Sequence, residues 1–355
     1  MIYNCHIHTF KEEDIPRRYL PLGLVRILAS TPGFKTIGFL LNWINPFTEN
    51  DQFSSYQRFI KIGKLKSQQD IFEECRKFYP RQSKFIVLSM DMKYMRAGKV
   101  PRNYEDQLME LAELKARYPE YVLPFVHADP RRPGIFDLVK KCIEDLNFTG
   151  IKLYPSLACF PYDPVLMPIL EYAQENKLPV MAHCSPNNPT FYHGCPRKIR
   201  RLFEGSKIPI IDGNSRNRRK LCANFASPEN YRFLLEQFPD LKICLAHWGS
   251  DYSWKKFLER PGETNDWFLI IKDLMEHYNN LYTDISFTVH NRDNFPLLKV
   301  MLTDQAIRQR ILFGSDFYMV ETKATERRFS IDLRGYLGEE DFKTIAVDNP
   351  VRYLS

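Results

Sequence analysis

The chain opens with the sequence MIYNCHIHTF, in which one residue separates His6 from His8. In a β-strand, residues i and i+2 point to the same face and lie roughly 6.6 Å apart along the strand. Two imidazoles placed in this way can bind one cation together. Because neutral imidazole suits Zn²⁺ and similar divalent ions, the opening segment carries half of a candidate metal site.

Further chemically capable residues occur in short aliphatic segments that read as buried strands. His183 lies in LPVMAHCS, His247 in LKICLAHWG and Asp316 in RILFGSDF, while Lys152 lies within FTGIKLYP. The carboxyl ends of the strands meet at one end of a parallel barrel. We therefore expect His183 to add an imidazole and Asp316 a carboxylate to the opening pair, with one coordination position left for water.

The elements that must position these residues alternate along the chain. Eight aliphatic or β-branched segments recur, and amphipathic helical segments separate most of them. This α/β rhythm predicts a (β/α)8 TIM barrel, and a doubly wound open sheet is the alternative because periodicity alone does not close a barrel. The predicted strands are 1–8, 84–92, 121–129, 148–155, 178–185, 241–249, 280–287 and 310–317, and the helical segments are 104–119, 135–146, 165–176, 228–239 and 265–278.

We expect residues 1–355 to form a single barrel domain with two insertions, about 11–80 after the first strand and 186–226 after the fifth. Loops that follow barrel strands emerge at the end where active sites lie, so both insertions are candidate lids or substrate-recognition elements. The apolar stretch at 36–47 could instead form a homo-oligomer contact.

Composition and charge narrow the class of protein. Hydrophobic residues make up 44% and charged residues 26% of the 355 residues, as in globular enzymes, and the net charge of +7 permits anionic partners. The eight cysteines form no CxxC pair, which indicates reduced thiols and a cytoplasmic location. No apolar segment reaches the ~20 residues of a membrane span, and the candidate site begins too early for a preceding signal peptide.

The second insertion is basic, with RKIRR at 197–201 and NSRNRRK at 214–220. Arg216, Arg218 and Arg219 could recognise an anionic substrate over the barrel mouth, and a solvated loop is the alternative reading. Nucleic-acid binding is disfavoured because the segment lacks interleaved aromatic residues.

Three other residues are candidate substrate contacts because they stand at or beside predicted strand ends. Tyr154 and Trp248 follow candidate site residues and could line a pocket, although such aromatics are also common in cores. Asp284 ends the strand that contains YTDIS.

Taken together, HIH, GIKLYP, MAHCSP, LAHWGS and ILFGSDF resemble the amidohydrolase superfamily of metal-dependent TIM-barrel enzymes. Within it, the chain resembles the amidohydrolase-related branch that includes aminocarboxymuconate-semialdehyde decarboxylase. The terminal DNPVRYL is similar to the closing helix of that branch, so the motifs span residues 6–354. The two insertions match no motif of the family.

The resemblance implies roles for individual residues. His247 matches a histidine that polarises substrate or water, or binds a second metal in binuclear members. Lys152 falls near a carboxylated lysine that bridges two metals, or it stays an ammonium that binds a substrate carboxylate, and we favour one metal over two. Members of the TatD type carry Glu at this place. The implied ligands of the one ion, expected to be Zn²⁺, are His6, His8, His183 and Asp316.

One position departs from the family pattern. Relatives usually carry an acidic residue two places before the first histidine of the opening motif, and this chain has Asn4 there. An amide is a weaker hydrogen-bond acceptor than a carboxylate, so the support of the metal ligands must differ.

The expected activity is that of a metal-dependent hydrolase. Metal-activated water would attack an amide, lactone or ester carbonyl of a small acidic substrate, with Asp316 taking the proton and His247 stabilising the oxyanion. The same site could instead serve a decarboxylase. A non-catalytic barrel that acts as a scaffold or binding protein is the alternative of another class.

Overall fold

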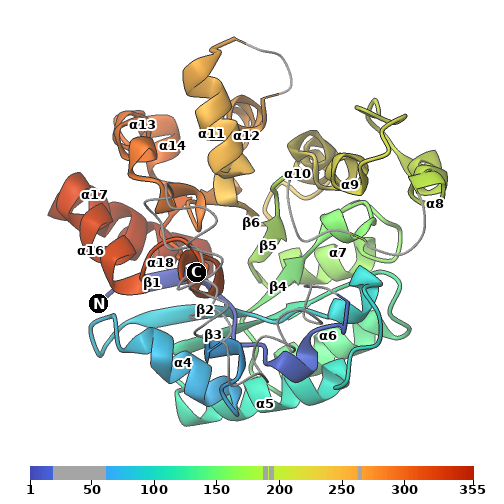
Figure 1. Cartoon of the computed structure of the whole chain (residues 1–355), viewed down its shortest axis with the longest axis horizontal. Coiled ribbons are helices and arrows are strands. Elements are labelled where there is room, and N and C mark those ends of the chain that lie inside the picture. Colours follow the sequence, from blue (N-terminus) through green and yellow to red (C-terminus); the bar gives the residue numbers. More distant parts are fainter. Residues whose placement is uncertain (19–60, 187–190, 192–195, 263–265) are drawn as a thin grey trace, which may run out of the picture.

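The structure is a computed structural model that describes residues 1–18, 61–186, 191, 196–262 and 266–355. Eight parallel strands pair in chain order and helices surround them (Figure 1). A doubly wound sheet would reverse its strand order, so the prediction of a (β/α)8 TIM barrel is confirmed. The strands are β1 (Tyr3–Ile7), β2 (Lys84–Leu88), β3 (Val122–His127), β4 (Gly150–Leu153), β5 (Val180–His183), β6 (Ile243–Ala246), β7 (Leu281–Asp284) and β8 (Ile311–Leu312).

Backbone hydrogen bonds join the first strand to the segment around β8. The Cys5 N–H donates to the Phe313 carbonyl at 2.8 Å, and the Asp316 N–H donates to the His6 carbonyl at 2.8 Å. Gly314 permits this approach, because a Cβ at that position would lie 2.8 Å from the Cβ of His6. The junction therefore brings His6 and Asp316 together from opposite ends of the chain.

The strands separate two apolar layers. Residues such as Cys5, Leu88 and Phe125 pack in a cluster inside the barrel, while Ile151 and Leu153 pack in the larger cluster between strands and helices. Since side chains alternate along a strand, Lys152 between these last two points into the barrel. Strand β4 thus carries a cation into an apolar interior.

The surrounding helices reproduce the predicted helical segments with trimmed ends. The predicted segment 228–239 divides into a 3₁₀ turn (Pro228–Tyr231) and α10, and the terminal motif forms α18. The helices are α4 (Gln68–Arg76), α5 (Tyr104–Arg117), α6 (Ile135–Glu144), α7 (Met167–Glu175), α8 (Pro196–Arg201), α9 (Arg218–Ala226), α10 (Arg232–Gln237), α11 (Ser250–Glu259), α12 (Trp267–His277), α13 (Phe295–Met301), α14 (Gln305–Arg308), α15 (Phe317–Val320), α16 (Glu326–Leu337), α17 (Glu339–Lys343) and α18 (Asn349–Leu354).

The two insertions are described in part. Helix α4 lies in the first insertion, and α8 and α9 lie in the second. The apolar stretch at 36–47 falls outside the described residues. Within the described part of the chain, no helix is both long enough and apolar enough to cross a membrane.

Candidate metal centre

A β-bulge in β1 aims the opening histidines. Asn4 pairs with Phe85 and Ile7 pairs with Val87. Between these two pairs β1 therefore contains one more residue than β2. A bulge of this kind redirects the side chains that follow it. Cys5 packs inside the barrel before the bulge, and His6 joins the other candidate ligands after it.

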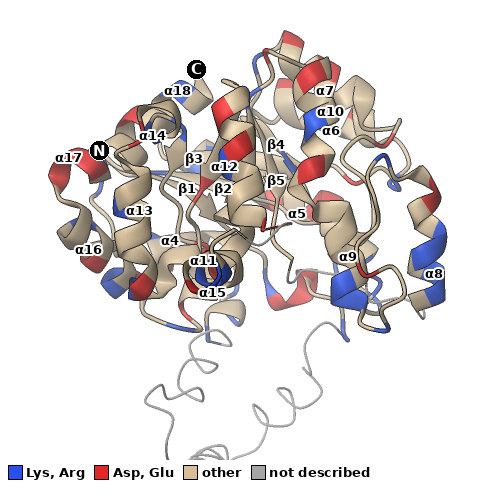
Figure 2. Cartoon of the chain, turned by 90° about the horizontal axis from the view of Figure 1, so that it is seen from above, with Lys and Arg blue, Asp and Glu red and all other residues tan. Residues whose placement is uncertain are grey.

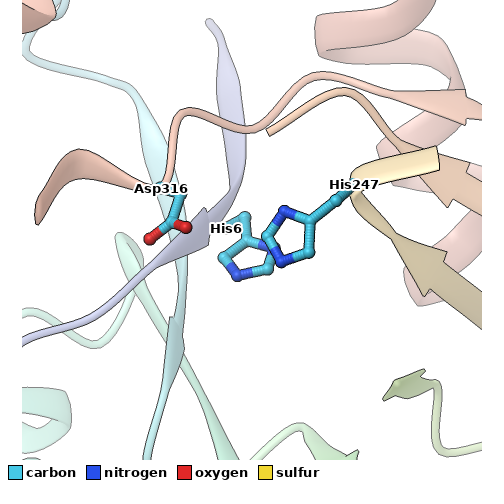
Figure 3. Close-up of side chains that lie close together, drawn as sticks. All are labelled: His6, His247 and Asp316. Atoms are coloured by element: carbon cyan, nitrogen blue, oxygen red, sulfur yellow. The ribbon is translucent and has the colours of Figure 1, made fainter. Parts of the chain in front are cut away.

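Three candidate ligands form a compact group. Ligand atoms of His6, His247 and Asp316 all lie within 4.8 Å of one another, and all three side chains are buried. Figure 3 shows them converging from β1, from the end of β6 and from the segment after β8. The positive φ angles of His247 and Asp316, 72° and 57°, turn the chain sharply here. Such backbone conformations cluster at functional sites.

His8 and His183 flank this group. The rings of His6 and His8 lie 5.4 Å apart, and those of His183 and His247 lie 4.9 Å apart. The four imidazoles, His6, His8, His183 and His247, are called the histidine cluster below. The compact trio thus contains His247, whereas the predicted ligand set contains His8 and His183, and that set stays a prediction.

Hydrogen bonds at Nδ1 orient three of the imidazoles. The Nδ1–H of His6 donates to Asp284 Oδ2 at 2.8 Å, and the Nδ1–H of His8 donates to the Leu88 carbonyl at 2.9 Å. His247 Nδ1 lies 3.0 Å from the Ser286 carbonyl. With Nδ1 protonated, Nε2 keeps its lone pair, which is the state that a metal ligand needs.

Electrostatics keeps the histidine cluster neutral. Burial lowers the pKa of all four imidazoles, and the pKa of His8 falls to about 3. The ammonium of Lys152 lowers each of these pKa values further. Neutral imidazoles are competent ligands at physiological pH.

The centre leaves three buried polar atoms without a hydrogen-bond partner among the described residues: Lys152 Nζ, His183 Nε2 and Asp316 Oδ1. Burial raises the pKa of Asp316 to about 8 and lowers that of Lys152 to about 8. Buried polar atoms are almost always paired, so these three fit a centre that receives a cation and an anionic ligand.

Asp284 lies in the centre, but its carboxylate is turned to the protein. Its Oδ1 accepts from the backbone N–H of His247 at 2.9 Å, and its Oδ2 accepts from His6. Asp284 thus holds the imidazole of His6 and the backbone N–H of His247, and its expected contact with a substrate stays a prediction. Its pKa is held well below the usual range by His6, against the effect of burial.

Ser286 is a residue of the centre that sequence reasoning missed. Its Oγ lies 2.9 Å from His247 Nδ1, 3.1 Å from His6 Nδ1 and 2.5 Å from Asp284 Oδ1. The spacing of two residues after Asp284, the same as that between the opening histidines, was the signal that could have found it.

The two aromatic candidates differ in position. The Tyr154 hydroxyl lies 3.4 Å from His8 Nε2, and its ring stacks 5.9 Å from His183, so it borders the histidine cluster. Trp248 is fully buried and packs 5.3 Å from both Trp254 and Phe268. The expectation that Trp248 lines the pocket is corrected, because its ring belongs to the core.

The basic candidates lie at the surface. Arg216 is exposed just before α9, and Arg218 and Arg219 are exposed at its start. Figure 2 shows basic residues on α8 and α9 at the end of the molecule that also carries α15, the helix that follows Asp316. This is the end where barrel active sites lie.

A family model described as Amidohydrolase matches residues 87–355, about three quarters of the sequence. The chain belongs to the amidohydrolase family. The match includes His183, His247 and Asp316, and it begins after His6 and His8. The resemblance noted from the sequence motifs is thus confirmed at the level of the family.

Solved structures of similar fold belong to proteins that are named for different reactions. A probable 2-pyrone-4,6-dicarboxylic acid hydrolase from Acinetobacter baumannii is 10% identical with a TM-score of 0.56, and the match covers 99% of this chain and 98% of that one. 4-Oxalomesaconate hydratase from Rhodopseudomonas palustris is 16% identical with a TM-score of 0.52, over 100% and 95% of the two chains. 2,6-Dihydroxybenzoate decarboxylase from Rhizobium is 17% identical with a TM-score of 0.52, over 81% and 88%. At these identities the likeness concerns the fold.

Proposed function

We propose that the chain is a cytoplasmic, metal-dependent hydrolase that cleaves an amide, lactone or ester bond of a small acidic substrate. The observation that carries the proposal is the histidine cluster packed against a buried carboxylate, with polar atoms of Lys152, His183 and Asp316 left unpaired among the described residues. Buried cysteines without disulfides, in the described ranges, support a reducing compartment.

His6, His8, His183 and Asp316 would hold one divalent ion, expected to be Zn²⁺. Such an ion lowers the pKa of a bound water toward ~7 and polarises a carbonyl oxygen. The chain prepares for it with imidazoles that burial keeps neutral and that Asp284 and the Leu88 carbonyl hold in place. Carboxylate and neutral imidazole together suit zinc.

Asp316, His247 and Lys152 would move a proton or stabilise negative charge during the reaction. Asp316 has an unpaired buried oxygen that can take the proton from water, and the side chain of His247, held by Ser286, can stabilise the oxyanion when its Nε2 carries a proton. The Lys152 ammonium can receive a substrate carboxylate, since it lies in the barrel without a hydrogen-bond partner in the described chain. The substrate would therefore be acidic.

A decarboxylase is the second candidate, and Lys152 is the observation that favours it. A buried ammonium beside the histidine cluster could hold a carboxylate that is about to leave as CO₂. The fold neighbours include both a hydrolase and a decarboxylase. Incorporation of ¹⁸O from labelled water into the product identifies hydrolysis, whereas release of labelled CO₂ from a carboxyl-labelled substrate identifies decarboxylation.

Metal analysis of protein purified without added metal tests the proposal. We expect about one equivalent of zinc in the wild type and clear loss in the His6→Ala/His8→Ala variant. His277→Ala is the matched control, because His277 is exposed on α12. Metal-free wild type would support the scaffold alternative, and equal metal in wild type and double variant would overturn the assignment of His6 and His8 as ligands. Two anomalous peaks ~3.5 Å apart would overturn the preference for one ion.

A further inference from the structure

A buried polar network lies behind the barrel wall, on the side of β1 away from the histidine cluster. Its members are Asn4, Tyr79, Ser315 and Glu326, and the first and last are fully buried. Asn4 Nδ2 lies 2.8 Å from Ser315 Oγ, 3.0 Å from the Tyr79 hydroxyl and 3.4 Å from Glu326 Oε1. The Tyr79 hydroxyl also donates to Glu326 Oε1. The network joins β1 to the first turn of α16.

The other end of the Asn4 amide holds two backbone segments of the metal centre. Its Oδ1 accepts from the His6 N–H at 3.3 Å and from the Ser315 N–H at 3.0 Å. The first of these N–H groups lies within the β1 bulge, where the ladder is interrupted. Because Ser315 precedes Asp316, one amide oxygen fixes the segments that carry two candidate ligands.

This function of Asn4 depends on the orientation of its amide. A flipped amide would present its NH₂ group to the two backbone N–H groups, and both would lose their acceptor. Glu326 Oε1 is an acceptor, so it selects the orientation in which Nδ2 points to α16 and Oδ1 points to β1. Burial of a carboxyl group is costly without such bonds.

We infer that Glu326 is a positioning residue of the metal centre, which acts through the Asn4 amide to set the bulge of β1 and so the places of His6 and Asp316. The inference rests on the proposed metal-dependent function. A purely structural role would instead fasten α16 to the barrel. The first turn of α16 is also held to the segment that precedes it, because the Glu326 N–H donates to Glu321 Oε1 at 2.6 Å.

Zinc affinity, measured by chelator competition, tests the inference. A Gln at position 326 can face Asn4 with either its carbonyl oxygen or its NH₂ group, so it no longer selects one orientation of the Asn4 amide. We therefore expect Glu326→Gln to weaken zinc binding about 10- to 100-fold, the range found for groups that orient metal ligands. Asn4→Asp alone should weaken it as well, because two carboxyl groups would then meet in the buried network. The double variant Asn4→Asp/Glu326→Gln reverses the polarity of the pair and keeps an acceptor for the His6 N–H. It should bind within about threefold of the wild type.

Two controls separate the possible outcomes. Glu321→Gln keeps the acceptor for the Glu326 N–H and should leave zinc affinity unchanged. The thermal stability of the metal-free variants shows whether a substitution weakens the packing of α16 on the barrel. Lowered stability of Glu326→Gln with wild-type zinc affinity, or failure of the double variant to recover affinity, would overturn the inference.

The His6→Ala/His8→Ala variant separates failure of the inference about Glu326 from failure of the proposed metal-dependent function. If it loses zinc while Glu326→Gln binds like the wild type, the proposed function stands and the inference falls. If the wild type binds no zinc, both fall. Should Glu326→Gln not fold, Tyr79→Phe supplies the measurement: we expect about threefold weaker zinc binding, and unchanged affinity would overturn the inference.

Discussion

Two groups of positive charge lie toward the active-site end of the barrel, and they differ in environment. Lys152 is fully buried, and its Nζ finds no hydrogen-bond partner within the described residues. Burial lowers its pKa to about 8, although Asp284 and Asp316 act in the opposite direction. The arginines at the start of α9 are exposed to solvent. One region holds a single desolvated charge, and the other holds several solvated ones.

The number of charged residues in a segment is therefore a poor guide to how strongly the segment attracts a substrate anion. Exposed charges are screened by salt and are already hydrated, so a substrate anion gains little from each of them. A buried ammonium has lost its water, and the energy of that loss is recovered when an anion arrives. The single lysine of GIKLYP should therefore matter more than the basic segment at 214–220.

Substitution of Lys152 should give the largest effect. We expect Lys152→Met to lower kcat/KM for an acidic substrate about 100-fold, as for loss of a charged hydrogen bond worth ~3 kcal/mol, and to affect a neutral analogue much less. Lys255→Met on α11 is the exposed control. Steady-state kinetics and zinc content are measured together. Loss of zinc in Lys152→Met would assign the lysine to the metal itself, against the role in substrate binding.

The stability of the metal-free protein should show the cost of this buried charge. The folded-state pKa of Lys152, about 8, lies below its ordinary value of 10.5, so the folded state binds fewer protons between these pH values. Below pH 8 the charged lysine destabilises the fold by about 3 kcal/mol, and this cost disappears as pH rises toward 10.5.

Urea unfolding of wild type and Lys152→Met across pH 7 to pH 10.5 measures this effect. We expect the variant to be more stable at pH 7 and the two proteins to converge at the alkaline end. A difference that stays constant with pH would show that Lys152 is paired or hydrated in the folded protein.

The α9 arginines should give the smallest effect. We expect Arg216→Gln/Arg218→Gln/Arg219→Gln to lower kcat/KM for an acidic substrate about threefold at low salt, with no difference at high salt. Lys140→Gln/Lys141→Gln/Lys177→Gln removes the same charge elsewhere and serves as control. A loss as large as that of Lys152→Met would reverse the comparison, and an equal response of neutral substrates would make the segment a solvated surface.

The sequence by itself determined the barrel and the end of it where the chemistry lies. Strand and helix patterns are local properties of the chain, and eight repeats favour a barrel, whereas the strand order of the structure decided between a barrel and a doubly wound sheet. Because every parallel strand ends at the same rim, residues at strand ends such as His183 and Asp316 could be expected to meet. The inward direction of Lys152 came from the structure, which places its neighbours Ile151 and Leu153 in the outer apolar cluster.

The tertiary structure decided how each of these side chains is held. A bulge in β1 places Asn4 on the opposite side of the strand from His6, against the simple alternation of side chains. The carboxyl group that meets Asn4 comes from Glu326, which is 322 residues away in the chain. No local pattern marks such a contact, because the packing of a helix on the barrel creates it. Hydrogen bonds across that distance exist only once the barrel has closed.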